Sequence, residues 1–245
     1  MRILAVTSYN GTNYQGWQKQ PNGNTIQDEI EKVLSQYFNR PISIYGAGRT
    51  DAGVHAEGQR FHFDVDTKDV DLDRLLYSIN SMLPKDIKIE DFEQVEDDFH
   101  SRFDAKEKVY VYTIYLGSKD VFFYPIMWMV PDKLDIELLK KCLTHFKGKH
   151  NFRNFTSKEE DEDGFVRTIY EIRVDQTTEK VINIVFRGNG FMRYTIRFIV
   201  GVAVECAKGN IKEEEVIDLL SLDGERRIVS SKAPANGLLL ADVIY

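Results

Sequence analysis

The sequence predicts an α+β fold in which two halves, residues 1–100 and 101–245, repeat the same order of elements. Two patterns lead to this prediction: apolar residues that alternate with polar ones indicate strands, and apolar residues at helical spacing indicate helices. Both patterns recur along the 245 residues in the order strand, helix, strand, strand, helix, strand. A chain of this length is long enough for one large domain or for two modest ones.

The first half begins with a strand at residues 3–9, where apolar and polar side chains alternate. Thr25 is expected to begin a helix, because its hydroxyl can cap free backbone N–H groups and Asp28 stands three residues later as its partner. Pro41 ends this helix, since proline cannot continue it. The remaining elements follow in order: strands at 42–45 and 61–65, a helix capped by Asp71 that runs to Leu83, and a strand at 87–95.

The second half repeats this order. It is expected to contain a strand at 108–116, a helix at 135–146, strands at 168–174 and 181–187, a long helix at 191–208, a short helix at 212–220 and a last strand at 238–244. Both halves therefore have the element order of ferredoxin-like folds. We expect two antiparallel sheets that meet around a central catalytic cleft, because ligands tend to bind in such clefts.

The charged residues are segregated along the chain, although the net charge is −7. Residues 138–158 contain six lysines and arginines and no acidic residue, and residues 180–204 also lack acidic residues. Because attraction to phosphate dominates nucleic-acid binding, two such stretches favour a basic surface over evenly solvated charges. The composition is therefore compatible with nucleic-acid binding in spite of the acidic net charge.

Secretion and membrane insertion are not expected. The longest apolar run, residues 198–204, is far shorter than the roughly 20 residues that span a bilayer. The N-terminus turns polar at Thr7 and lacks a cleavage site of small residues. Cys142 and Cys206 fall among helix-spaced apolar residues, which favours buried free thiols over a disulfide. We therefore expect a cytoplasmic protein with no membrane partner.

The densest chemical signal is the segment 46–56, Gly-Ala-Gly-Arg-Thr-Asp-Ala-Gly-Val-His-Ala, between two predicted strands. Its three glycines allow sharp turns and a close approach of a ligand to the backbone. Asp51 is its one carboxylate, with Arg49 two residues before it and His55 four residues after it. Aspartate in a glycine-rich loop is often only a turn former, so composition alone does not establish a catalytic role. The spacing of the histidines and cysteines is not that of a metal site.

The segment 48–56 resembles the signature of the tRNA pseudouridine synthase A family, in which the aspartate is catalytic. The similarity covers most of the chain and keeps the order of the family's segments. It includes residues 9–18, 20–21 and 25–27, then 102–105 with 110–112, 152–155, 167–169, 191–193 with 197–201, and 233–238. The sequence departs from the family pattern at Asn10, Arg60, Tyr194 with Thr195, and Lys232.

The resemblance implies that the protein converts uridine to pseudouridine in the anticodon stem-loop of tRNA, at tRNA positions 38 to 40. It also implies no metal or organic cofactor, and a homodimer that binds tRNA across both subunits. Asp51 is implied as the catalytic residue, either as the nucleophile at the ribose C1′ or as the base that removes a ribose proton. Carboxylates act in this way where positive charge develops at C1′, as in glycoside hydrolysis.

The resemblance further implies that Tyr110, Arg49 and Arg197 bind the substrate. Arg197 would keep Asp51 ionised in a cleft, although it could instead extend to water from an apolar helix. Tyr110 would stack on the target base and handle the C5 proton, unless it is a core aromatic residue of its strand. Arg49 would enter the RNA stack as the uridine flips out, or it could contact a phosphate.

Two other functions fit part of the sequence. A non-catalytic RNA-binding module could stack bases on exposed aromatic residues of a ferredoxin-like sheet. A hydrolase of another nucleic-acid bond could use Asp51, although such enzymes generally need carboxylate clusters that bind metal. Neither alternative would form pseudouridine.

Overall fold

The computed structural model describes residues 1–245 except 22, 68, 132, 161–163 and 222–224. Its contacts divide the chain into two compact units. The first unit comprises Met1–Lys106 and Leu239–Tyr245, and the second comprises Glu107–Leu238. The last strand of the chain therefore belongs almost entirely with the first unit.

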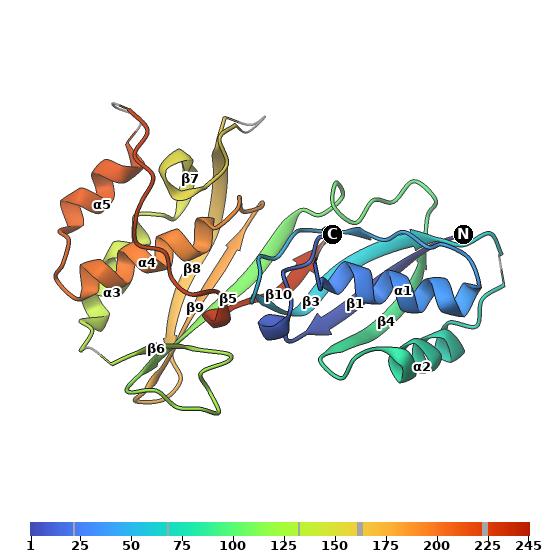
Figure 1. Ribbon diagram of the computed structural model, residues 1–245. Helices are drawn as coiled ribbons and strands as arrows, with labels where there is room; N and C mark the ends of the chain where they lie inside the picture. The colour runs from blue at the N-terminus through green and yellow to red at the C-terminus, as the bar shows by residue number, and fades with distance from the viewer. Residues whose placement is uncertain (22, 68, 132, 161–163, 222–224) are drawn as a thin grey trace. The chain divides into compact units, whose positions relative to one another are not determined.

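The first unit is a mostly antiparallel sheet with two helices on one face (Figure 1). Its elements are β1 (Arg2–Tyr9), α1 (Ile26–Phe38), β2 (Tyr45–Gly46), β3 (His55–Asp64), α2 (Leu72–Met82), β4 (Ile87–Val95) and β10 (Leu238–Ile244). The strand order is β4-β1-β3-β10. The short strand β2 pairs with the C-terminal end of β3, whereas β10 pairs with its N-terminal end. The pairing of β3 with β10 is parallel, whereas the other pairings in this unit are antiparallel.

The core of the first unit follows from the alternation in its strands. Ile3 and Ala5 pair with Phe63 and Phe61, so all four side chains lie on one face of the sheet, and all four are fully buried. The Phe38 ring at the end of α1 lies 6.3 Å from the ring of Phe63. The predicted N-cap of α1 is confirmed, because the Thr25 hydroxyl accepts a hydrogen bond from the Asp28 N–H group. Asp71 caps α2 in the same way.

The second unit is also a sheet with helices packed beside it (Figure 1). Its elements are β5 (Glu107–Leu116), β6 (Trp128–Val130), α3 (Ile136–Thr144), β7 (Gly148–Asn151), β8 (Val166–Gln176), β9 (Val181–Gly188), α4 (Thr195–Ala207) and α5 (Glu213–Leu220). The antiparallel order is β5-β9-β8-β7, and β6 lies parallel to β5. These arrangements confirm the predicted α+β fold class. Among the described residues, no helix is long and apolar enough to cross a membrane.

Helix α4 starts four residues later than its apolar pattern predicts. Tyr194 adopts a left-handed backbone conformation, with φ 68° and ψ 0°, and the helix begins only at Thr195. A bulky residue rarely adopts this conformation, so hydrophobic spacing could not reveal it. The strands β6 and β7 are short and were likewise not predicted.

Cys142 of α3 and Cys206 of α4 are both buried, as expected, and their sulfur atoms face each other. The two helices pack side by side, which places both sulfurs in one apolar interface. The Cα atoms lie 7.1 Å apart, wider than the roughly 4.4–6.8 Å of most disulfides. Helix α4 is thus held against α3 by apolar packing.

Candidate active site

The loop at residues 47–54, which joins β2 to β3, contains two of the four predicted site residues. Arg49 is exposed and Asp51 is half-buried, whereas Thr50 between them is 7% exposed. The threonine therefore faces the interior of the first unit while its two neighbours lie at the surface. The buried Thr50 therefore holds the backbone on which Arg49 and Asp51 are carried.

Hydrogen bonds fix the backbone of the loop at Thr50 and at Asp51. The hydroxyl groups of Thr50 and Tyr9 are 2.8 Å apart and form a buried hydrogen bond. The Trp17 N–H group donates to the Thr50 carbonyl oxygen at 3.1 Å, and the Val54 N–H group donates to the Asp51 carbonyl oxygen at 3.1 Å. Burial raises the pKa of Tyr9, so its phenol stays neutral and can serve this hydrogen bond.

Two glycines of the N-terminal segment allow that segment to lie directly against the loop. A Cβ atom on Gly16, which has φ +96°, would lie 2.6 Å from the Thr50 carbonyl oxygen. A Cβ atom on Gly11 would lie 2.0 Å from the Val54 carbonyl oxygen. Both distances are too short for any side chain, so residues 11–17 form the supporting wall of the loop.

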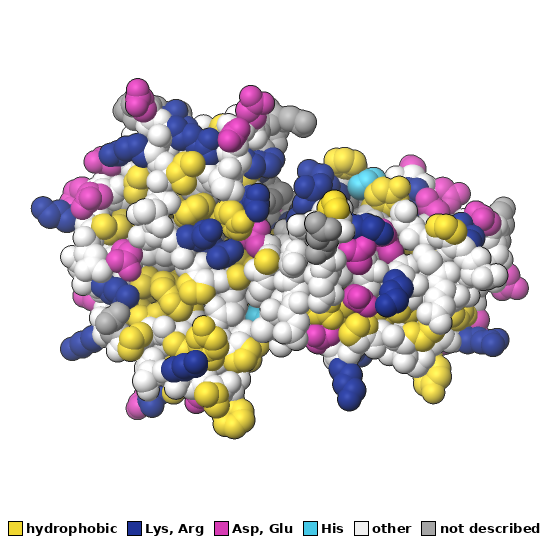
Figure 2. Space-filling model, viewed as in Figure 1, with side chains coloured by type: hydrophobic (Ala, Val, Ile, Leu, Met, Phe, Trp, Pro, Cys, Tyr) yellow, Lys and Arg dark blue, Asp and Glu magenta, His cyan; other side chains and the backbone are white. Residues whose placement is uncertain are grey.

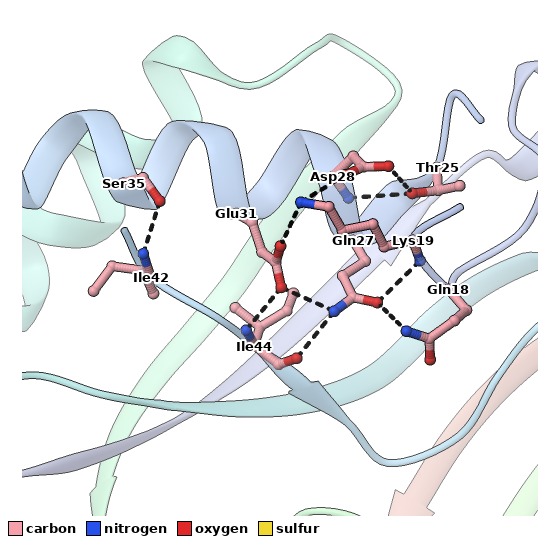
Figure 3. Close-up of polar contacts among 9 residues, drawn as sticks. All are labelled: Gln18, Lys19, Thr25, Gln27, Asp28, Glu31, Ser35, Ile42 and Ile44. Atoms are coloured by element: carbon pink, nitrogen blue, oxygen red, sulfur yellow. Dashed lines mark hydrogen bonds and ion pairs between the residues drawn. The ribbon is translucent and has the colours of Figure 1, made fainter. Parts of the chain in front are cut away.

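A buried polar network around Gln27 holds this wall in place (Figure 3). The Gln27 Oε1 atom accepts hydrogen bonds from Gln18 Nε2 at 2.7 Å and from the Lys19 N–H group at 3.1 Å. Its Nε2 atom donates to Glu31 Oε1 at 2.9 Å and to the Ile44 carbonyl oxygen at 3.2 Å. All four hydrogen-bonding positions of the amide are therefore used.

The network connects the two chain segments that flank the loop. Glu31 accepts from the Ile44 N–H group at 3.1 Å and from Lys19 Nζ at 3.2 Å, so its buried carboxylate has three partners (Figure 3). Ile44 precedes β2, which leads into the loop, and the Gln27 N–H group donates to the Trp17 carbonyl oxygen at 3.0 Å. We did not predict this support from the sequence. Its only signal is a pair of polar residues, four positions apart, beside the apolar stripe of α1.

Replacing Gln27 by leucine should destabilise the first unit and disturb the loop. The change leaves several buried polar groups without partners, at a cost of about 1–3 kcal/mol for each unsatisfied group. We expect urea denaturation to show a loss of about 2–4 kcal/mol in the free energy of unfolding. Gln36→Leu is the matched control, because Gln36 is exposed on the same helix. Equal stability of the two variants would contradict the role of the network.

Tyr110 and Arg197, the other two predicted site residues, belong to the second unit. Tyr110 lies on β5, is 8% exposed and packs edge-on against Phe191, with ring centroids 5.4 Å apart. Tyr112, two residues further along the same face, is fully buried and donates its hydroxyl to the Pro234 carbonyl oxygen at 2.8 Å. Tyr112 is thus a core residue, as the alternation of the strand predicts.

Arg197 lies in the first turn of α4 and is 9% exposed. Its Nε atom donates to the Ala233 carbonyl oxygen at 2.8 Å, and the Ala233 N–H group donates to the Arg197 carbonyl oxygen at 2.9 Å. Its charge also opposes, in part, the rise that burial causes in the pKa of Tyr112. Arg197 is therefore held inside the second unit, and the alternative that it extends to water from an apolar helix is wrong.

Two other kinds of site, for a metal ion and for RNA, find little support elsewhere in the described residues. Within the described parts of the chain, no group of three or more histidine, cysteine, aspartate or glutamate residues is placed to hold a metal ion. A pocket beside β4 in the first unit is lined by four carboxylates, Glu93, Glu96, Asp98 and Asp104. Such a lining repels phosphate, so this pocket is a poor candidate for RNA binding.

Comparisons with known proteins identify the family of this chain. A family model for tRNA pseudouridine synthase matches residues 5–104 and 143–245. The tRNA pseudouridine synthase A of Exiguobacterium sp. strain AT1b is 38% identical over 244 residues, which cover 100% of this chain and 98% of that protein. The tRNA pseudouridine synthase A of Thermodesulfovibrio yellowstonii is 38% identical over 256 residues, which cover 100% of this chain and 100% of that protein. The chain belongs to the tRNA pseudouridine synthase A family.

Among solved structures, an H/ACA ribonucleoprotein bound to a substrate RNA containing 2′-deoxyuridine shows a more distant likeness. The matched region covers 80% of this chain and 44% of the chain in that structure, with 12% sequence identity and a TM-score of 0.37.

Proposed function

We propose that the protein is an isomerase that converts uridine to pseudouridine in the anticodon stem-loop of tRNA, at positions 38 to 40. The observation that supports this most directly is the 47–54 loop, which presents Asp51 and Arg49 on a backbone anchored by Thr50. Membership of the family supports the reaction class. The reaction needs one well-placed carboxylate and no redox step, which fits what this loop offers.

The chemistry exchanges one bond to the ribose for another. The bond between N1 and C1′ breaks, the uracil turns, and C5 bonds to C1′. The proton on C5 then leaves and N1 takes up a proton, so the composition of the nucleotide is unchanged. Asp51 either attacks C1′ as a nucleophile or removes a ribose proton as a base, and both roles require an ionised carboxylate.

We assign substrate-binding roles to the remaining three residues. The Tyr110 ring stacks on the target base, a contact worth about 1–3 kcal/mol. Arg49, exposed beside Asp51, fills the space in the RNA stack that the flipped uridine leaves, or contacts a phosphate. Arg197 supplies a buried positive charge that favours an ionised carboxylate. We also propose a cytoplasmic homodimer, which sedimentation equilibrium tests against the single-chain mass of 28.4 kDa.

The proposal is tested with a tRNA transcript that carries tritium at C5 of its uridines. We expect the protein to release tritium in the presence of a chelator, with pseudouridine mapped to positions 38 to 40. A non-catalytic RNA-binding module would bind the transcript without release. A metal-dependent hydrolase would shorten the RNA and stop in chelator. Either result would refute the proposed function.

A further inference from the structure

Three cationic side chains surround the ring of Tyr194 in the second unit. The Lys232 Nζ atom lies 4.2 Å from the ring centroid, and the guanidinium carbons of Arg193 and Arg197 lie 4.7 and 5.2 Å from it. The Arg193 Nη2 atom also donates to the Tyr194 hydroxyl at 2.8 Å. We call these four residues the Tyr194 cluster. Cation–π attraction explains how the cations gather at the ring, but it does not neutralise them.

The cluster has a net positive charge, and the sequence around its residues contains no aspartate or glutamate. Within the described chain, neither Arg193 nor Lys232 lies within salt-bridge distance of a carboxylate, and both side chains are exposed. Residues 180–204 and 226–241 contain no acidic residue. Lys and Arg side chains also gather over α4 and around β7 and β8 on the face shown in Figure 2. Because like charges repel one another, this arrangement favours an anion from outside the chain.

The backbone keeps the cluster in place before any ligand binds. The two hydrogen bonds between Arg197 and Ala233 fix the segment that contains Lys232 to the first turn of α4. A Cβ atom on Gly201 would lie 2.4 Å from the Ser231 carbonyl oxygen, so this segment lies directly against the helix. Tyr194 itself is held in the left-handed conformation, which a non-glycine residue rarely adopts and which is enriched at functional sites.

A buried hydroxyl at the same turn is a second, independent observation. Thr195, the first residue of α4, is 1% exposed, and its Oγ1 atom has no hydrogen-bond partner among the described residues. Tyr194 stands at the N-cap of the helix and provides no side-chain cap. The turn therefore has unused hydrogen-bonding capacity next to three positive charges.

We infer that the Tyr194 cluster is a binding site for a phosphodiester of the tRNA backbone. The exposed Lys232 ammonium and Arg193 guanidinium groups are donors suited to phosphate oxygens, and the N-terminus of the 13-residue helix α4 adds to the attraction. Contacts of this kind position the RNA without reading its sequence. The inference rests on the proposed function, since it names a contact that the tRNA substrate makes.

The test measures how the affinity for a tRNA transcript depends on salt. Lys232→Ala and Arg193→Ala should each flatten the slope of log K against log salt by about one, because each removes one phosphate contact. Lys232→Arg keeps the charge and should retain the wild-type slope. Lys119→Ala is the matched control, because Lys119 is an exposed lysine 4.9 Å from the ring of Tyr124, and no second cation of the described residues lies over that ring. It should leave both the slope and pseudouridine formation unchanged.

The outcomes separate this inference from the proposed function. Thermal melts first confirm that each variant folds. Wild-type slopes in Lys232→Ala and Arg193→Ala, in a protein that forms pseudouridine, would overturn the phosphate site alone. Equal flattening in Lys119→Ala would also overturn it, because the effect would then be one of general charge. Flattened slopes specific to the cluster, in a protein that forms no pseudouridine, would support the site and refute the proposed function.

Discussion

Asp51→Asn protein should fold and bind tRNA but form no pseudouridine, even with enzyme in excess over RNA. Asparagine has nearly the same size as aspartate, but it has no charge to offer at C1′ and cannot act as the nucleophile or the base. The loop is held by backbone groups and by Thr50, so the substitution should change stability by at most about 1–2 kcal/mol. The measurement is single-turnover formation of pseudouridine beside a binding isotherm of the same preparation.

The control for this experiment is Asp66→Asn, which removes one negative charge from an exposed position of the first unit. Asp66→Asn should leave turnover unchanged. The tRNA affinity of both variants should stay within about tenfold of the wild type. Asp51→Asn protein that isomerises uridine at a rate comparable to the wild type would overturn the assignment of Asp51.

Substitutions of Tyr110 should separate stacking from proton transfer. Tyr110→Ala removes the ring and should lose most turnover, because stacking on a base is worth about 1–3 kcal/mol. Tyr110→Phe keeps the ring and should bind tRNA like the wild type. If the hydroxyl handles the C5 proton, Tyr110→Phe should also lose turnover, by about 10²–10⁴-fold. Single-turnover rates and binding isotherms of the two variants measure both effects.

Tyr112→Phe is the matched control, because Tyr112 lies on the same face of β5. It loses the buried hydrogen bond to Pro234, so we expect a loss of about 1 kcal/mol in stability with turnover retained. Unimpaired turnover in Tyr110→Ala would mean that Tyr110, like Tyr112, only packs in the core.

The sequence predicted those features that depend on local chemistry. The caps at Thr25 and Asp71 are visible because a short polar side chain stands directly before an apolar helical pattern. The glycine-rich loop and its single carboxylate are visible because their residues are adjacent in the sequence. The burial of Cys142 and Cys206 was also predictable, but the contact between their sulfur atoms depends on how α3 packs against α4 and was not.

Other features depend on residues that are distant in the sequence. The left-handed Tyr194 lies in an apolar stretch whose spacing continues that of α4, so the pattern alone places the start of the helix too early. The cations around its ring come from two segments, and Lys232 reaches it only because the chain returns along α4. Gln27 is similar, since three of its partners, Gln18, Lys19 and Ile44, become its neighbours only when other segments pack around α1.

The place of β10 has a consequence for how the protein is made on the ribosome. This strand pairs with β3 at His55 and Ala56, directly after the Asp51 loop, and the Lys106 N–H group donates to the Ile244 carbonyl oxygen. The first unit therefore emerges during translation with part of the β3 edge unpaired, and it stays so while the whole second unit is synthesised. Unpaired edges invite pairing with other chains. This strand, which protects the unit with the Asp51 loop, is thus translated only after the second unit, so a nascent chain that stalls before β10 exposes an edge prone to aggregation.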